Sequence, residues 1–155
     1  MADPLQIVPN VAQHLVDEDL AVLPADANGV NPVVFHDPKD GSPIPVGDYA
    51  GGTITLTTIG SRSAEEDHSR TRRVVGFNVR ASTNARAELL IDQIEALFTP
   101  LETWGGRKQF EMGAINPVEL CIPFRQRSRV AVDKDGYQWD LAYEFWVRRT
   151  VLAAG

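Results

Sequence analysis

The stretch that decides the fold runs from Val79 to Phe98 and reads VRASTNARAELLIDQIEALF. Its second half repeats apolar residues at spacings of three and four, which predicts a helix with one apolar stripe. The stripe consists of Ala87, Leu90, Ile91, Ile94, Leu97 and Phe98. One residue from Ser82 to Asn84 can cap its start, and Thr99-Pro100 ends it, because a residue before proline avoids the helical region. We expect this helix to cover one face of a β-sheet.

Segments with strand character lie on both sides of this helix. Thr53 to Ile59 is rich in β-branched residues, and Arg72 to Ala81 alternates along its length, so both are expected to be strands. Apolar residues occupy every second position from Tyr137 to Val147, which predicts a strand with one apolar face. Strands after the helix are expected near Lys108 to Ile115, Leu120 to Val132 and Tyr137 to Thr150, with a turn at Asp133 to Gly136.

The N-terminal part of the chain adds a second helix and a long irregular connection. Apolar spacing predicts a helix from about Pro9 to Asp19. From Pro24 to Gly52 proline and glycine recur, and only Val33 to Phe35 has strand character. A connection this long is often functional, so we expect it to contact a partner.

These elements predict one α+β domain over residues 1–155, because no spacer divides the chain. Its expected core is an antiparallel or mixed β-sheet with one long amphipathic helix packed on one face and an N-terminal helix. A long protruding β-hairpin arm is expected between the strands at Thr53 and Arg72, because the polar segment from Gly60 to Arg70 far exceeds a usual hairpin loop.

Two features are predicted to contact a neighbouring subunit or another partner. The first is the arm, whose length and charge favour contact, although a solvated loop has the same composition. The second is Trp146, which falls on the polar face of the last strand, where it forms an interface or packs beneath a neighbouring element. The predicted contact residues are Arg62, Glu65, Glu66, Asp67, Arg70, Arg72 and Trp146.

The composition of the chain disfavours several classes of function and location. The net charge of -6 disfavours general nucleic-acid binding, and the basic clusters at Arg70 to Arg73 and Arg125 to Arg129 are expected to be solvated strand faces. The lone Cys121 favours folding in a reducing compartment. The N-terminus lacks the pattern of a signal peptide, so a soluble, intracellular protein is expected.

No catalytic or metal-binding motif is present in the sequence. Potential metal ligands gather at His36 to Asp40 and at Glu65 to His68, without the spacing of a metal site. The sequence contains no nucleophile elbow, phosphate-binding loop or dinucleotide fingerprint, and His14 and Cys121 are expected to be packed. We therefore predict no catalytic residue, cofactor or metal, and a function in binding protein subunits.

The order of elements resembles the tail terminator and minor tail proteins of long-tailed bacteriophages. The segment from Val79 to Phe98 is similar to their strand-to-helix unit, and the segment from Trp139 to Arg148 is similar to their final strand. The resemblance in organisation spans nearly the whole chain.

This resemblance implies a structural virion protein that forms a ring, commonly a hexamer, at the end of the tail tube. Such a ring terminates tail growth and provides the surface for head-tail joining. The implied partners are other copies of the chain, the tail tube protein and a head-tail connector protein, with no membrane and with DNA passing through a lumen without specific binding. The implied location is the virion tail, assembled in the host cytoplasm. Another head-tail connector or minor capsid protein is the alternative, and a small enzyme or ligand-binding α+β domain is a distant third.

Overall fold

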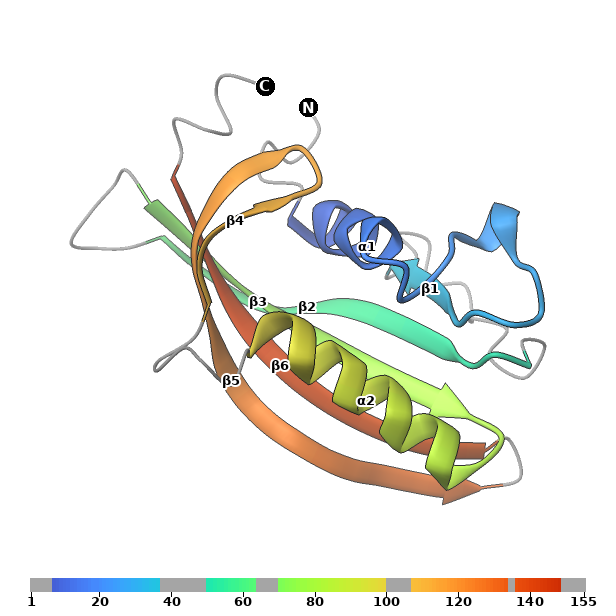
Figure 1. The fold of residues 1–155 in the computed structure, drawn as a ribbon. Coiled ribbons are helices and arrows are strands. Elements are labelled where there is room, and N and C mark those ends of the chain that lie inside the picture. The colour runs from blue at the N-terminus through green and yellow to red at the C-terminus, as the bar shows by residue number, and fades with distance from the viewer. Residues whose placement is uncertain (1–6, 37–49, 64–69, 100–106, 134–135, 149–155) are drawn as a thin grey trace.

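The computed structural model describes residues 7–36, 50–63, 70–99, 107–133 and 136–148 (Figure 1). The helices and strands in this part of the chain are α1 (Ile7–Asp17), the short 3-10 helix η1 (Pro24–Asp26), β1 (Val33–His36), β2 (Thr53–Ser63), β3 (Arg70–Ala81), α2 (Asn84–Phe98), β4 (Arg107–Met112), β5 (Ile115–Asp133) and β6 (Gly136–Arg148). The strands form one six-stranded sheet in the order β1-β2-β3-β6-β5-β4. β1 is parallel to β2 and the other pairs are antiparallel, so the fold is α+β with a mixed sheet.

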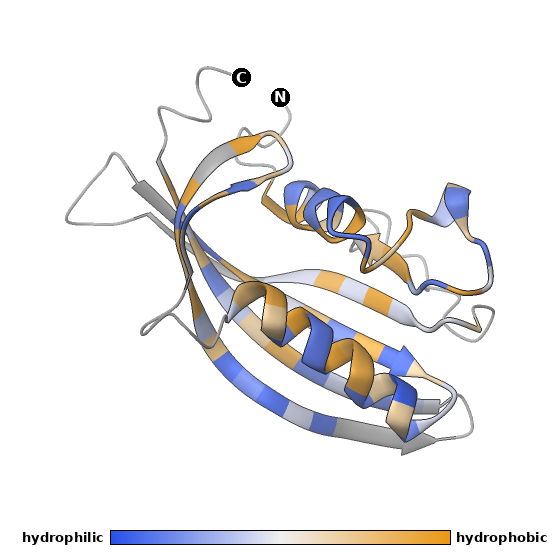
Figure 2. Cartoon of the chain, viewed as in Figure 1, coloured by the Kyte–Doolittle hydropathy of each residue, from blue (hydrophilic) through white to orange (hydrophobic). Residues whose placement is uncertain are grey.

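The sheet curls strongly into a half-barrel, and both helices lie within its curve (Figure 1). α2 packs on β3, β5 and β6, whereas α1 packs on β1, β2 and β4. The outward side of α1 is hydrophilic and the side that faces the sheet is hydrophobic (Figure 2). Helices and sheet thus enclose one apolar core between two layers.

Aromatic rings occupy the centre of this core. Phe98, the last residue of α2, is fully buried, and its ring centroid lies 5.4 Å from those of Phe77 and Tyr143. The ring of Phe145 stands edge-on to Phe98, with centroids 5.5 Å apart. His14 of α1 is buried and lies 5.8 Å from the same ring. This cluster joins both helices to β3 and β6.

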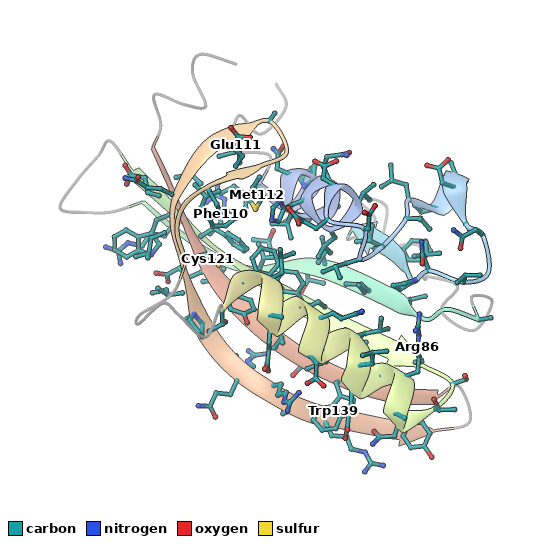
Figure 3. All side chains as sticks on the ribbon, viewed as in Figure 1. Arg86, Phe110, Glu111, Met112, Cys121 and Trp139 are labelled. Carbon is teal, nitrogen blue, oxygen red and sulfur yellow. The ribbon has the colours of Figure 1, made fainter. Side chains whose placement is uncertain are left out.

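The helix predicted from the apolar stripe is confirmed as α2. Thr83 is its N-cap, and the Thr83 hydroxyl accepts a hydrogen bond from the Arg86 backbone N–H at 3.2 Å. The Arg86 guanidinium donates to the carbonyl oxygens of Gly51 at 3.2 Å and Val30 at 3.1 Å. The Trp139 indole N–H donates to the side-chain oxygen of Asn84, the first residue of α2, at 3.0 Å. Figure 3 shows Arg86 and Trp139 at this end of α2. These bonds tie the start of α2 to the connection before β2 and to β6.

The N-terminal helix begins two residues earlier than predicted. It starts at Ile7, so Pro9 lies in its first turn, where a missing N–H leaves no helical hydrogen bond unmade. It ends at Asp17, and Asp19 then adopts a left-handed backbone with φ of 60°. The sequence pattern gave the correct element with shifted ends.

The strands on either side of the predicted arm are longer than expected. β2 and β3 remain paired as far as Ser63 and Thr71, so residues 60–63 belong to a strand and not to a loop. β6 pairs with β3 as far as Arg70 and Arg148. The base of the predicted arm is therefore a three-stranded ribbon, because backbone pairing overrides the loop-like Gly and Ser composition.

The hairpin of β4 and β5 curves over the open side of the core toward α1 (Figure 1). The strand expected from Lys108 to Ile115 ends at Met112, because Gly113, with φ of 59°, forms the turn. The Asn10 side-chain oxygen of α1 accepts a hydrogen bond from the Ala114 backbone N–H at 2.7 Å. This contact fixes the hairpin tip against α1.

Candidate subunit interface

The structure brings together two of the predicted contact residues, Arg72 and Trp146. They are direct cross-strand partners on β3 and β6, and the Arg72 guanidinium carbon lies 4.0 Å from the centroid of the Trp146 ring. The Trp146 indole N–H donates to a carboxylate oxygen of Glu144 at 2.7 Å. A cationic group stacked on an indole ring is stabilised by the ring quadrupole. Trp146 is therefore held in one orientation.

This Arg72–Trp146–Glu144 cluster lies on the face of β6 opposite α2. Side chains alternate along a strand, and Phe145 between the two β6 members contacts Phe98 of α2. Glu144 is only 8% exposed although neither helix covers this face, and its cross-strand partners are Val74 and Ile122. The Arg72 Nε atom is buried and has no hydrogen-bond partner among the described residues.

The other predicted contact residues are positioned only in part. Arg62 and Arg70 lie at the ends of β2 and β3, where Arg62 pairs with Arg72 and Arg70 pairs with Arg148 in the backbone register. Glu65, Glu66 and Asp67 lie outside the described residues. The assignment of these side chains to a contact surface stays a prediction.

The exposed edge of β5 is a surface that the sequence did not reveal. β4 pairs with β5 only as far as Cys121, so beyond that residue the outer edge of β5 has no partner strand within the described residues. Residues 123–129 are all exposed, and Phe124 is 49% exposed. The cluster from Arg125 to Arg129, expected to be a solvated strand face, therefore lies along a sheet edge. The only sequence signal was a phenylalanine directly before three arginines at alternate positions.

Each arginine of this edge has a different environment. The Arg127 side chain bonds Asp92 of α2 and lies 3.5 Å from a carboxylate oxygen of Glu95, and the hydrogen bond with Asp92 is the main cause of its raised pKa. Arg125 stands 3.9 Å from Asp140, and its side chain is 49% exposed. The Arg129 guanidinium carbon lies 5.5 Å from the Tyr137 ring centroid. Arg127 thus links β5 to α2, while Arg125 and Arg129 stay accessible.

A groove of about 850 Å³ runs between α2 and β5. At its floor the Tyr143 hydroxyl forms a 2.6 Å hydrogen bond with the Thr99 hydroxyl. Burial raises the pKa of Tyr143 to about 12, so its phenol is neutral at physiological pH. The groove is lined by Asp92, Glu95, Ala96, Thr99, Pro123, Arg125, Gln126, Arg127, Leu141 and Tyr143. The two carboxylates that α2 contributes to this groove, those of Asp92 and Glu95, both contact the Arg127 side chain.

The remaining reactive side chains lie in the core. Cys121 is a buried free thiol, and Figure 3 shows it with Phe110 and Met112 beneath the curve of β4 and β5. His14 lies between the rings of Phe98 and Phe110, with centroids at 5.8 and 5.6 Å. Within the described residues no group of three or more His, Cys, Asp or Glu side chains is arranged to hold a metal ion.

No protein-family model matches the sequence, and no curated protein matches it significantly. In the described part of the chain, neither α-helix provides the long apolar stretch that a bilayer crossing requires.

Proposed function

We propose that this chain is a structural protein of a bacteriophage tail. It forms a ring at the end of the tail tube, terminates tail growth and provides the surface for head-tail joining. The proposal combines the resemblance of residues 79–98 and 139–148 to tail terminator proteins with one structural observation. That observation is the exposed β5 edge, which carries Phe124 among arginines outside the helix-covered core.

A closed ring places a specific demand on its subunit. Each copy needs two different surfaces that meet when one subunit is rotated onto the next. A half-barrel supports this role, because a sheet that does not close on itself has two edges, and here β1 and the β4–β5 pair lie at opposite ones. An exposed phenylalanine on such an edge is typical of a contact surface, since aromatic residues are enriched at interface centres.

The finer proposal concerns the β2–β3 hairpin arm. We assign Arg62, Glu65, Glu66, Asp67 and Arg70 to contacts with the tail tube or a neighbouring subunit. The three-stranded ribbon at the base of the arm supports this role, since it gives the loop between β2 and β3 an ordered support.

The function is tested by mixing the purified full chain with its tail tube protein and imaging the tubes by electron microscopy. We expect rings on tube ends and a shorter, narrower distribution of tube lengths than without the chain. A chain that leaves both the tube ends and the length distribution unchanged would refute the proposal. A chain that binds capsid portals but not tubes would instead identify a head-tail connector.

The arm has its own test in the same assay. The triple variant Glu65→Gln, Glu66→Gln, Asp67→Asn removes three charges without changing the length of the loop. We expect capping of tubes to weaken, while Glu88→Gln on the exposed face of α2 leaves capping unchanged. If both variants cap tubes equally well, the acidic residues of the arm do not take part in the contact.

A further inference from the structure

Charge is distributed unequally between the two edges of the sheet. On the β5 side Phe124, Arg125 and Arg129 are exposed. On the β1 side four carboxylates are exposed: Asp17 ends α1, Glu18 and Asp19 follow it, and Asp26 ends η1. We refer to these two surfaces as the basic edge and the acidic end.

The geometry of the basic edge excludes a simple extension of the sheet. Pro123 lacks a backbone N–H, and the register of β5 against β6 shifts between Pro123 and Arg125, between Arg125 and Ser128, and between Arg129 and Ala131. Such irregularities are how proteins prevent continuous strand addition at an edge. A partner must therefore be recognised through side chains.

The side chains of the basic edge suit an acidic partner with an apolar centre. Arg127 is already paired with carboxylates of α2, whereas Arg125 has one long ion pair and Arg129 lies over an aromatic ring. Phe124 precedes Arg125 in the chain, and about half of its surface is exposed. An apolar centre with charged residues around it is the usual composition of a protein interface.

The acidic end of the same chain provides the complementary features. Val30 is 72% exposed, the highest value among the large hydrophobic residues described. The Asn28 side-chain oxygen accepts hydrogen bonds from the backbone N–H groups of Val30 and Asn31, both at 2.9 Å, and Arg86 bonds the Val30 carbonyl oxygen. This exposed apolar residue is therefore held in a fixed turn.

The charge of the acidic end is unfavourable in the isolated subunit. Asp17, Glu18 and Asp19 stand at the C-terminus of α1, where the helix dipole disfavours negative charge. Within the described residues, Asp17 has a hydrogen bond only from the neutral Gln13 side chain, at 2.8 Å. A positively charged partner surface would relieve this repulsion.

We infer that a second copy of this chain docks head to tail, with the basic edge of one subunit against the acidic end of the next. Phe124 then packs against Val30, and Arg125 and Arg129 face the carboxylates from Asp17 to Asp19. The inference rests on the proposed function, because it names the interface through which the ring closes. The two surfaces differ and lie toward opposite edges of one sheet, so the contact is heterologous and repeats from copy to copy. An acidic peptide would match the arginines but would leave the acidic end without a role.

The interface is tested by reversing charge on each surface of the full-length chain. The basic-edge variant carries Arg125→Glu and Arg129→Glu, and the acidic-end variant carries Asp17→Lys and Glu18→Lys. Sedimentation velocity over a range of protein concentrations measures self-association at about 0.05 and 0.5 M salt. We expect the wild type to associate more strongly at low salt and each variant alone to associate about tenfold or more weakly.

An equimolar mixture of the two variants gives the most specific result. Each mixed contact joins either two native surfaces or two reversed surfaces, so opposite charges meet at every interface and association returns. A control with Glu88→Lys and Glu111→Lys replaces two exposed carboxylates on α2 and β4 with lysines, which matches the charge change of the acidic-end variant. This control is expected to associate at least as well as the wild type, because the change lies outside both surfaces.

Disulfide cross-linking tests the same interface when association is too weak to measure by sedimentation. A variant with Val30→Cys and Phe124→Cys is expected to form a ladder of disulfide-linked oligomers on oxidation, since the two positions lie toward opposite edges of one subunit. Each single cysteine variant, which can link only like surfaces, is expected to give no ladder. A wild type that stays monomeric together with a double variant that forms no ladder would overturn the inference.

The results separate the interface from the proposed function. If both charge variants associate and cap tubes like the wild type, the interface is wrong and the ring function stands. If the variants lose association but the wild type never caps tubes, the interface stands and the tail function is wrong. Association that is lost in the basic-edge variant but not restored in the mixture would identify another acidic partner for the arginines and would also overturn the inference.

Discussion

Replacing Phe98 with alanine is expected to cause a large loss of stability. The Phe98 side chain is fully buried at the junction of the two helices and the sheet. Truncation of a buried phenylalanine costs about 3–5 kcal/mol, and its ring pairs place this site in the upper part of that range. The five rings around Phe98 are those of His14, Phe77, Phe110, Tyr143 and Phe145. We expect a loss of about 4–5 kcal/mol.

Urea unfolding followed by circular dichroism measures the loss in the free energy of unfolding, and thermal unfolding measures the corresponding change in Tm. For a chain of this size about 1 kcal/mol corresponds to a shift of roughly 2–4 °C in Tm, so Phe98→Ala should lower Tm by about 8–20 °C. The matched control is Phe124→Ala, which removes the same atoms from an exposed position and should change stability by less than about 1 kcal/mol. Phe98→Leu keeps most of the buried volume and should lose less than half as much. Equal losses for Phe98→Ala and Phe124→Ala would refute the aromatic cluster as the centre of the core.

Three further predictions test particular contacts. Thr83→Ala should cost about 1 kcal/mol in urea unfolding because α2 loses its N-cap, whereas Thr83→Ser should cost little. Gly113→Ala should lower Tm, because φ of 59° is strained for alanine and its Cβ would lie 2.3 Å from the Asn10 side-chain oxygen. Because the pKa of Tyr143 is raised to about 12 in the folded chain, the stability from its neutral phenol is fully present below pH 10 and lost as pH rises toward 12. Unfolding free energies measured over this pH range should fall less steeply for Tyr143→Phe.

The parts of the fold that follow from local pattern were predictable from sequence. The stripe ending at Phe98 and the alternation from Tyr137 to Val147 identified α2 and β6, because burial on one face imposes a period on the residues. Residues 60–63 were misassigned to a loop because their Gly, Ser and Arg composition is turn-like. Their strand conformation depends on pairing with β3, a tertiary interaction.

The candidate interface was predictable only in part, because strand order and register are not local properties. The sequence placed Arg72 and Trp146 on polar strand faces, but their stacking depends on the pairing of β3 with β6. In the same way, the alternation from Arg125 to Arg129 predicts which side chains share one face of a strand, but it does not predict which strand lies beside it. Within the described residues, β4 pairs with β5 only as far as Cys121, and these arginines therefore lie on a sheet edge.

β6 connects the two surfaces that the proposals assign to assembly. Near its end it pairs with β3 at the base of the arm, and its other side pairs with β5 before the basic edge. Trp146 lies between the two neighbouring strands, since its backbone pairs with Arg72 of β3 on one side and Leu120 of β5 on the other. For this reason, variants that test the arm must keep Arg72 and Trp146 intact, because loss of their stacking would disturb both surfaces at once.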